Sequence, residues 1–396
     1  MNFVFISPNY PDNFWMFCRG LKKYGVRVLA IVDTPYNMLQ PELKQYCDEC
    51  YVVQSFNNYD DMVRALGYYT FKYGKIDWIE SNNEAWLTLD AKLRDDFNVK
   101  TGFNFATIDE YQSKSGMKKY YEEAGVPTAR YCLPKTLDDA LEFAHKVGYP
   151  LVLKPDHGVG ASFTYKCLND EDLTKYFNET TNFVMILEEY INADVFTLDG
   201  ICNGNGDIVY LSSMEYVGNC MDSVMNQSSI GSYTAIEISD EYRDIAQRTI
   251  RAFKLKNRFF HGEFFRLKED VEGLGKKGTV LGLEVNFRPP GGFAPDLMNY
   301  SSDIDVFELW AQVLMTQECP DYKEKKYTCG FAGRRFAVNY KYTAQQLQQM
   351  YGASVLYVKI LPPALAAGMG DEMIVERFKT EAEMIQFMND AFALAE

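Results

Sequence analysis

The segment GLEVNFRPPGG, residues 282–292, carries three polar side chains at alternate positions and then breaks in two prolines and two glycines. Side chains of a strand alternate between its two faces, so Glu284, Asn286 and Arg288 point to one face and the hydrophobic residues between them to the other. A carboxylate, an amide and a guanidinium that converge beside such a break are typical of the lining of a cleft. Taken alone, a solvated edge strand explains the alternation about as well.

Another carboxylate lies in the aromatic segment RFFHGEFFRL, where Glu263 has four phenylalanines as close neighbours in the sequence. An unpaired carboxylate is costly to bury, and a metal ion would offset that cost; a wet strand end is the alternative. Mg²⁺ takes hard oxygen ligands and keeps several waters, so one or two carboxylates, an amide and nucleotide phosphates suffice to hold it. We expect His145 and His261 to pack or to form hydrogen bonds rather than to bind a ligand.

A small glycine-rich loop, PDHGVGAS, follows the strand LVLK, which ends in Lys154. Glycines let backbone N–H groups approach phosphate oxygens, and a lysine supplies a compact positive charge, so the pair suits a polyphosphate. The loop is not a Walker A loop, which requires G-x-x-x-x-G-K-[ST] at the start of a helix. A β-hairpin turn that contains Gly158 and Gly160 explains the glycines about as well.

The composition indicates a globular protein of two or three domains, with 396 residues, 47% of them hydrophobic and 24% charged. A formal net charge of −15 argues against nucleic acid or an anionic membrane as the main partner, because both attract clustered Lys and Arg. We find no signal-peptide pattern and no apolar run of membrane-spanning length, and therefore expect a cytoplasmic protein. Nine cysteines, with one C-x-x-C at Cys47 and Cys50, indicate reduced thiols rather than a disulfide framework or a zinc site.

The first hundred residues alternate strand and helix patterns. The order FVFI, NYPDN, a helical stretch ending in LKKYG, and VRVLAIV predicts a βαβ unit and a parallel sheet. The first turn lacks G-x-G-x-x-G, so the dinucleotide-binding fingerprint is missing. A second strand, KIDWIE, leads through the polar loop SNN into a helix, and a loop at the carboxyl end of a parallel strand is placed to contact a ligand.

Five segments in this order resemble the ATP-grasp superfamily, particularly its carboxylate–amine ligase and biotin-carboxylase-like branch: NNEAW, YQSKSGMKKYYEEAGVPTARY, YPLVLKPDHGVGAS, LEEYINADVFTLDG, and HGEFF followed by LEVNFRPPGG. They span residues 75–292. The resemblance implies an α/β chain with an N-terminal parallel-sheet (pre-ATP-grasp) domain at 1–105. It further implies an ATP-grasp domain at 106–315, with a small lid subdomain at about 120–187, and a small α+β C-terminal domain at 316–396.

The resemblance also implies how a nucleotide is bound. Lys114 and Lys154 match the two phosphate-contacting lysines, and the loop HGVGAS matches the one that closes over the triphosphate. The loop contributes His157, Gly158 and Gly160.

The adenine-reading hinge is matched by Glu188, Glu189, Tyr190 and Ile191, with the side-chain role on Glu188. At the ribose position the family often has an acidic residue, but this chain has Val195, with Asp194 beside it. Ribose recognition is therefore a point where this chain departs from the pattern.

For the metal, Glu263 and Glu284 match the two carboxylates that hold Mg²⁺, and Asn286 matches the third ligand. Arg288 matches the residue that stabilises the phosphorylated intermediate. ATP and Mg²⁺ are the implied cofactors, with Mn²⁺ as an alternative metal. The interval at 266–283 is longer than usual, and its turn-rich sequence EGLGKKG predicts an extended hairpin loop.

The implied activity is that of a carbon–nitrogen ligase, in which ATP converts a carboxylate to an acyl phosphate that an amine captures, releasing ADP and phosphate. A bicarbonate-using carboxylase of the same fold is an alternative, although no Q-V-E-H follows Arg288; a non-catalytic ATP-binding protein is another, favoured by Val195. The expected partners are small-molecule carboxylate and amine substrates, with a homodimer expected by analogy. The Ser-, Asn- and Met-rich segment 210–237, near the acceptor site in the family's architecture, does not identify the substrate.

Overall fold

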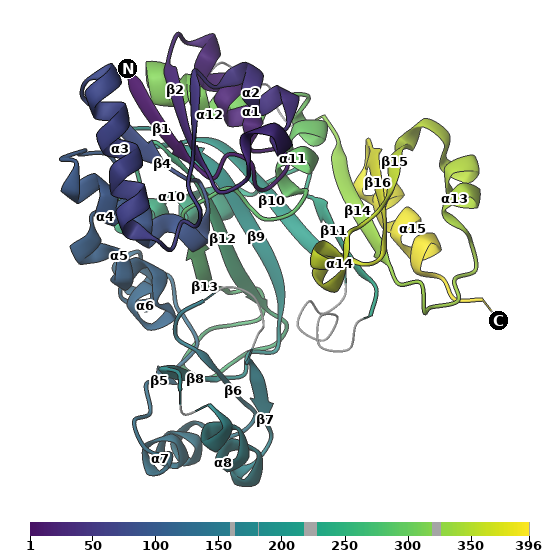
Figure 1. Ribbon diagram of the computed structural model, residues 1–396. Coiled ribbons are helices and arrows are strands. Elements are labelled where there is room, and N and C mark those ends of the chain that lie inside the picture. The colour runs from purple at the N-terminus through teal and green to yellow at the C-terminus, as the bar shows by residue number, and fades with distance from the viewer. Residues whose placement is uncertain (159–162, 181, 218–227, 319–325, 396) are drawn as a thin grey trace.

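The computed structural model describes residues 1–158, 163–180, 182–217, 228–318 and 326–395. Within these ranges the strands form three sheets, one at the N-terminus, one large central sheet and one small sheet (Figure 1). Gly160, and with it most of the predicted triphosphate loop, lies outside the described residues, as does part of the segment 210–237. None of the helices in the described ranges combines the length and hydrophobicity that crossing a bilayer requires.

The N-terminal sheet is parallel, with the order β3-β2-β1-β4, as the sequence predicts. Its strands are β1 (Asn2–Ile6), β2 (Arg27–Val32), β3 (Glu49–Val52) and β4 (Trp78–Glu80). Strand β1 is hydrophobic on both faces because Phe3 and Phe5 enter one core cluster and Val4 and Ile6 enter another. Such two-sided burial is what helices on both faces of a parallel sheet require. The helices and short turns of this part are α1 (Trp15–Lys23), η1 (Tyr36–Met38), α2 (Pro41–Tyr46), α3 (Tyr59–Tyr73), η2 (Glu84–Trp86) and α4 (Leu87–Asp96).

The central sheet is antiparallel, with the order β13-β12-β9-β10-β11-β14-β16-β15. Its strands are β9 (Ala193–Cys202), β10 (Ile208–Val217), β11 (Ile230–Thr234), β12 (Arg258–Leu267), β13 (Val280–Asn286), β14 (Thr328–Arg334), β15 (Val355–Ile360) and β16 (Glu372–Phe378). Strands β12 and β13 pair as an antiparallel hairpin, in agreement with the extended hairpin expected at 266–283. The C-terminal strands join the same sheet through β11 and β14, so hydrogen bonding crosses from the central part into the tail.

The small sheet, at the bottom of Figure 1, has the order β5-β8-β6-β7 and is covered by helices α7 and α8. Its strands are β5 (Tyr131–Cys132), β6 (Leu151–Pro155), β7 (Tyr165–Cys167) and β8 (Met185–Glu189), and its helices are α7 (Leu137–Val147) and α8 (Asp170–Glu179). Helix α7 begins with a capping box in which Thr136 and Asp139 each accept a backbone N–H of the other residue. The apolar side chains of α7, α8 and this sheet form a separate core.

The other helices cover the central sheet and its tail: α5 (Phe105–Gln112), α6 (Lys114–Glu123), α10 (Asp240–Ala252), α11 (Ala294–Ser302), α12 (Val306–Thr316), α13 (Ala344–Tyr351), α14 (Pro363–Met369) and α15 (Glu381–Phe392), with the short turn η3 (Gly352–Ser354). Helix α12 packs tightly on α1 of the N-terminal part. A Cβ at Gly20 would lie 3.0 Å from the Phe307 carbonyl oxygen and 3.1 Å from the Ala311 Cβ, so glycine permits this close approach.

Buried ionic groups also join the N-terminal sheet to the central sheet. Glu80, at the end of β4, accepts a hydrogen bond from Arg94 Nη2 at 3.0 Å and another from Arg258, the first residue of β12. Arg94 also donates to the Ile79 carbonyl oxygen at 2.7 Å. All three charged side chains are nearly inaccessible to water, so this group fixes the end of β4 against the start of β12.

We predict that Glu80→Gln lowers the free energy of unfolding by about 3–5 kcal/mol, because it leaves the buried Arg258 without its counter-charge and Arg94 with only Asp90, 3.9 Å away. Denaturant unfolding followed by circular dichroism measures the change. The control is Asp244→Asn, which breaks an exposed ion pair with Arg248 in α10 and should cost less than about 1 kcal/mol. Equal losses in the two variants would contradict a structural role for the buried group.

Candidate nucleotide and metal site

Two carboxylates face each other across neighbouring strands. Glu263 of β12 and Glu284 of β13 are directly opposed in the register, and a β-bulge follows Glu263. Opposed antiparallel residues have Cβ atoms about 4.5–5.5 Å apart, and like charges there destabilise the sheet. Asn286 lies on the same face of β13, opposite His261. Two carboxylates and an amide are thus gathered on one face, which is the alternation that the sequence predicts.

The two carboxylates have opposite pKa shifts. Burial and the negative charge of Glu263 raise the pKa of Glu284, although Lys114 and Lys154 oppose the rise. Burial also acts to raise the pKa of Glu263, but His261, Arg288 and Lys154 outweigh it and lower the value. The side chains are 31% and 15% exposed, so solvent reaches both. Glu284 thus bears both the cost of burial and the repulsion of Glu263, and a bound cation would relieve both.

The donor set suits Mg²⁺. Glu263, Glu284 and Asn286 supply two carboxylates and one amide oxygen, which are hard ligands of the number that Mg²⁺ takes from protein when phosphates and waters complete its shell. Among the described residues, no group of three or more His, Cys, Asp and Glu side chains has a metal-holding arrangement. A transition-metal site of that kind is therefore not seen in the described part of the chain, and a magnesium–nucleotide site requires none.

We call the face that carries Glu263, Glu284 and Asn286 the carboxylate wall. His261 forms hydrogen bonds next to this wall. Its Nδ1 lies 2.6 Å from Asp199 Oδ1 and its Nε2 lies 3.3 Å from Glu263 Oε1. Thr197 donates to the other oxygen of Asp199 at 2.5 Å. Burial acts to lower the pKa of His261, but the two carboxylates outweigh it and raise the value to about 9. His261 is therefore a charged hydrogen-bonding residue, in line with the sequence-based expectation, and the sequence did not reveal its partner Asp199.

Two lysines share one buried carboxylate beside the wall. Lys154, in β6, lies 2.5 Å from Glu188 Oε2, and Lys118, in α6, lies 2.6 Å from Glu188 Oε1. Burial acts to raise the pKa of Glu188, but the two lysines outweigh it and lower the value to about 2. Burial lowers the pKa of Lys118 in spite of Glu188. With two cations for one anion, this cluster keeps surplus positive charge, which suits a phosphate.

Lys118 was missed in the sequence interpretation. It follows Lys114 by four positions in a helix, a spacing that brings side chains to the same face. That spacing was the available signal, but it is common on solvated helices and does not by itself indicate burial.

Lys114 bridges the glycine-rich loop and the carboxylate wall. The start of α6 is held by Asp156, whose carbonyl oxygen accepts the Lys114 N–H and whose carboxylate accepts the Ser115 N–H, each at 2.8 Å. The Lys114 ammonium donates to the Gly158 carbonyl oxygen at 2.8 Å and lies 4.0 Å from Glu284 Oε2. Gly158 has a φ of +106°, a conformation that favours glycine.

Arg288 meets a residue from the N-terminal sheet. Its Nε lies 3.8 Å from Glu84 Oε2, and its Nη1 donates to the Pro289 carbonyl oxygen at 2.9 Å. Glu84, in the loop after β4, also accepts from Gln112 Nε2 at 3.1 Å. Burial raises the pKa of Glu84, although Arg288 opposes the shift. The segment after β4 thus reaches Arg288 through Glu84, and a ligand contact by the SNN loop stays a prediction.

Two of the predicted nucleotide-binding side chains, those of Asp194 and His157, do not point toward Glu263 and Glu284. Asp194 lies 2.9 Å from Lys268 and is half exposed. Thr197 is paired with Glu263, and Asp194, three positions earlier on β9, points to the other face of the sheet. His157 points to Asp109 of α5, with Nε2 3.0 Å from Oδ1.

The hinge side chains have protein partners of their own. Glu189 accepts two hydrogen bonds from Arg130, from its backbone N–H at 2.8 Å and its Nε at 2.7 Å. The Lys166 ammonium lies 3.7 Å from the centre of the Tyr190 ring, and Ile191 is buried in a small apolar cluster. The adenine-reading role of the hinge stays a prediction.

Comparison with known proteins gives this geometry a context. Residues 109–258 match the model of the carbamoyl-phosphate synthase L chain, ATP binding domain. The chain is 22% identical over 279 residues to the L-arginine-specific L-amino acid ligase of Bacillus subtilis, an alignment that covers 68% of this chain and 64% of that ligase. The L-amino acid ligase from Bacillus licheniformis superposes with a TM-score of 0.71 at 16% identity, covering 98% of this chain and 96% of that one. Residues 109–258 therefore carry an ATP-grasp domain.

A second solved structure agrees with this chain in fold. The N5-carboxyaminoimidazole synthetase from Staphylococcus aureus complexed with ADP superposes with a TM-score of 0.71 at 14% identity, over 99% of this chain and 96% of that one. The resemblance carried by the five sequence segments, and the α/β fold it implies, are confirmed. ATP and Mg²⁺ are the cofactors typical of the superfamily. The chain nevertheless spans less than two thirds of the length of its first curated relatives, 64% for the arginine-specific ligase and 18% for a carbamoyl phosphate synthase large chain.

We predict that the Glu188 cluster makes stability depend on pH. The lowered pKa means that Glu188 stabilises the fold above its ordinary pKa of 4.5, and that this contribution is lost as the pH falls toward about 2. The free energy of unfolding of the wild type should exceed that of Glu188→Gln by roughly 3 kcal/mol at pH 7, and this difference should shrink between pH 5 and pH 2. Apparent unfolding free energies across this range test it, and a difference that does not change with pH would contradict the charged pairing.

Proposed function

We propose that this protein is an ATP-dependent carboxylate–amine ligase. In this reaction the γ-phosphoryl group of ATP is transferred to a substrate carboxylate, and an amine displaces phosphate from the acyl phosphate to form an amide or peptide bond. ADP and phosphate are the other products. The observation that carries the proposal is the directly opposed pair Glu263 and Glu284, with Asn286 on the same face and Lys114 4.0 Å from Glu284.

Lysines supply the charge that ATP phosphates require. Lys118 and Lys154 exceed the single carboxylate of Glu188 by one positive charge in a buried setting, where an electrostatic interaction is stronger than in water. Lys114 is the first residue of α6, and Asp156 of the glycine-rich loop holds this helix start through its carbonyl oxygen and its carboxylate. We assign phosphate contacts to Lys114 and Lys154, with Lys118 setting the position of Glu188 between them.

The metal ligands would be Glu263, Glu284 and Asn286. When bound there, Mg²⁺ would neutralise the negative charge that develops during phosphoryl transfer. His261 donates toward Glu263 and is itself anchored by Asp199, so it orients that ligand.

Arg288 lies at the end of β13 with its guanidinium between Glu84 and the Pro289 carbonyl oxygen. A positive charge beyond the metal ligands suits stabilisation of the transferred phosphoryl group. Glu84 holds this arginine and has one carboxylate oxygen without a hydrogen-bond partner in the described structure. We infer that the second substrate enters beside Arg288, where the Pro-Pro-Gly-Gly segment ends the strand.

Amino acids are the first substrates to test, because the relatives reported above include an L-arginine-specific L-amino acid ligase and an L-amino acid ligase. A bicarbonate-using carboxylase of the same fold would release ADP with bicarbonate and an amine acceptor instead. Product mass spectrometry separates the two, because carboxylation adds the mass of CO₂ whereas ligation joins two substrates with loss of water.

We predict that Glu284→Gln abolishes ADP release, lowering kcat by at least about 100-fold, while it weakens nucleotide binding much less. The reason is that the metal is needed most where charge develops in the transition state. The assay measures ADP over pairs of amino acids and small carboxylic acids, with mass spectrometry of the product. Glu142→Gln, an exposed change on α7, is the matched control and should retain activity. A Glu284→Gln protein with normal turnover would refute the assignment.

A nucleotide-binding protein without turnover is the second candidate. It is favoured by Val195 at the ribose position and by the direction of Asp194, which points away from the carboxylate face. ATP binding by the wild type without ADP release across the whole substrate panel would select this candidate over the ligase.

A further inference from the structure

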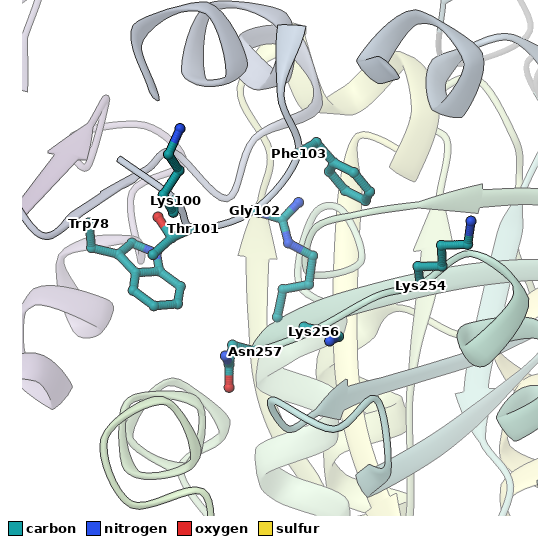
Figure 2. Close-up of a pocket in the computed structure, with 9 residues that line it drawn as sticks. Trp78, Lys100, Thr101, Gly102, Phe103, Lys254, Lys256 and Asn257 are labelled. Carbon is teal, nitrogen blue, oxygen red and sulfur yellow. The ribbon is translucent and has the colours of Figure 1, made fainter. Parts of the chain in front are cut away.

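A basic pocket lies where the N-terminal part meets the start of β12. Its volume is about 220 Å³, and Figure 2 shows Trp78, Lys100 and Thr101 on one side and Lys254 on the opposite side. Lys256 and Arg258 also line it. We call this cavity the basic pocket.

The lysines of the basic pocket form no direct ion pair with any described residue, although Lys254 is close enough to Glu110 of α5 to help lower the pKa of that carboxyl. Lys100, Lys254 and Lys256 are exposed, and none of them forms an ion pair within the ranges that the structure describes. No carboxylate is among the lining residues. Arg258 contributes little free charge, because it is paired with Glu80 and stacked over Phe103 at 5.2 Å. In a chain of net charge −15, three lysines without a direct ion pair around one cavity form a local positive field that attracts an anion.

Unusual backbone conformations fix both sides of the pocket. Lys254 and Asn257 have φ values of +54° and +53°, a left-handed conformation that costs a lysine roughly 1–2 kcal/mol and that asparagine adopts more readily. Gly102, on the other side, has a φ of +75°, and a Cβ there would lie 2.8 Å from the guanidinium carbon of Arg94. Such conformations persist where the surrounding structure holds them, and they gather at ligand sites. The pocket is therefore built from two constrained loops.

The basic pocket is separate from the proposed nucleotide site. Arg258 and Glu263 lie on the same strand, five positions apart, which corresponds to roughly 16 Å along the strand. An odd separation places their side chains on opposite faces of the sheet. A ligand of the basic pocket would thus bind without contacting the Glu263 and Glu284 pair.

We propose that the basic pocket binds a small phosphate-bearing anion, of the class of a phosphomonoester. Lysine ammonium groups provide compact point charges suited to phosphate oxygens. The volume is smaller than that of pockets for drug-sized ligands, which limits the occupant to a small molecule. Because the pocket is lined by both the 100–103 and 254–258 segments, a bound anion links the N-terminal part to the central sheet and stabilises the folded state by mass action.

The test is a titration of the full-length protein with inorganic phosphate and with glycerol phosphate, at constant ionic strength set with chloride. Tryptophan fluorescence reports the environment of Trp78, and the thermal unfolding midpoint reports stabilisation. We expect a saturable fluorescence change and a rising midpoint with either anion. The double variant Lys254→Gln/Lys256→Gln should bind at least about tenfold more weakly, because two of the three unpaired charges are gone.

Two controls separate the basic pocket from other phosphate sites. Lys379→Gln, an exposed change in the C-terminal part, should titrate like the wild type. Lys154→Gln, in the proposed nucleotide site, should keep the response. The proposal is overturned if the double variant titrates like the wild type, if the wild-type response does not saturate, or if Lys154→Gln alone removes it.

Discussion

The repulsion between Glu263 and Glu284 is the interaction on which the rest of the site depends. Strand pairing places the two carboxylates directly opposite each other, and the hairpin between β12 and β13 fixes that register. A slip of one residue would turn either side chain to the other face of the sheet. The fold therefore holds two like charges together, and the pKa of Glu284 is raised in spite of Lys114 and Lys154. A divalent metal bound with nucleotide phosphates would relieve the repulsion between the two carboxylates.

Each of the three sheets contributes one part of the site. The central sheet supplies the carboxylates. The small sheet supplies Lys154, which forms an ion pair with the buried Glu188 and does not lie on open surface. The N-terminal sheet supplies Glu84, which meets Arg288. Because these residues are distant in sequence, the site depends on contacts between the sheets. The buried Glu80 group at the end of β4 is one such contact, and it precedes the loop that carries Glu84.

Local patterns in the sequence were sufficient to predict parts of this structure. The alternation of Glu284 and Asn286 with hydrophobic residues is a property of one strand, and the parallel N-terminal sheet follows from alternating strand and helix patterns. The partner of His261 was not predictable, because Asp199 is 62 positions away and only sheet register brings the two together. The same limit applies to the C-terminal strands, whose pairing with β11 joins segments about a hundred residues apart. The direction of the Asp194 side chain also follows from sheet register, because the register sets which face of β9 each side chain occupies.

The central claim is that the opposed carboxylates and Asn286 form a metal-binding wall for a nucleotide. Anomalous X-ray scattering from Mn²⁺, in crystals grown with Mn²⁺ and ADP, locates the metal directly. The account predicts an anomalous peak within coordination distance, about 2.0–2.6 Å, of oxygens of Glu263, Glu284 and Asn286. A peak elsewhere in the chain, or bound ADP with no metal at these three residues, would contradict it.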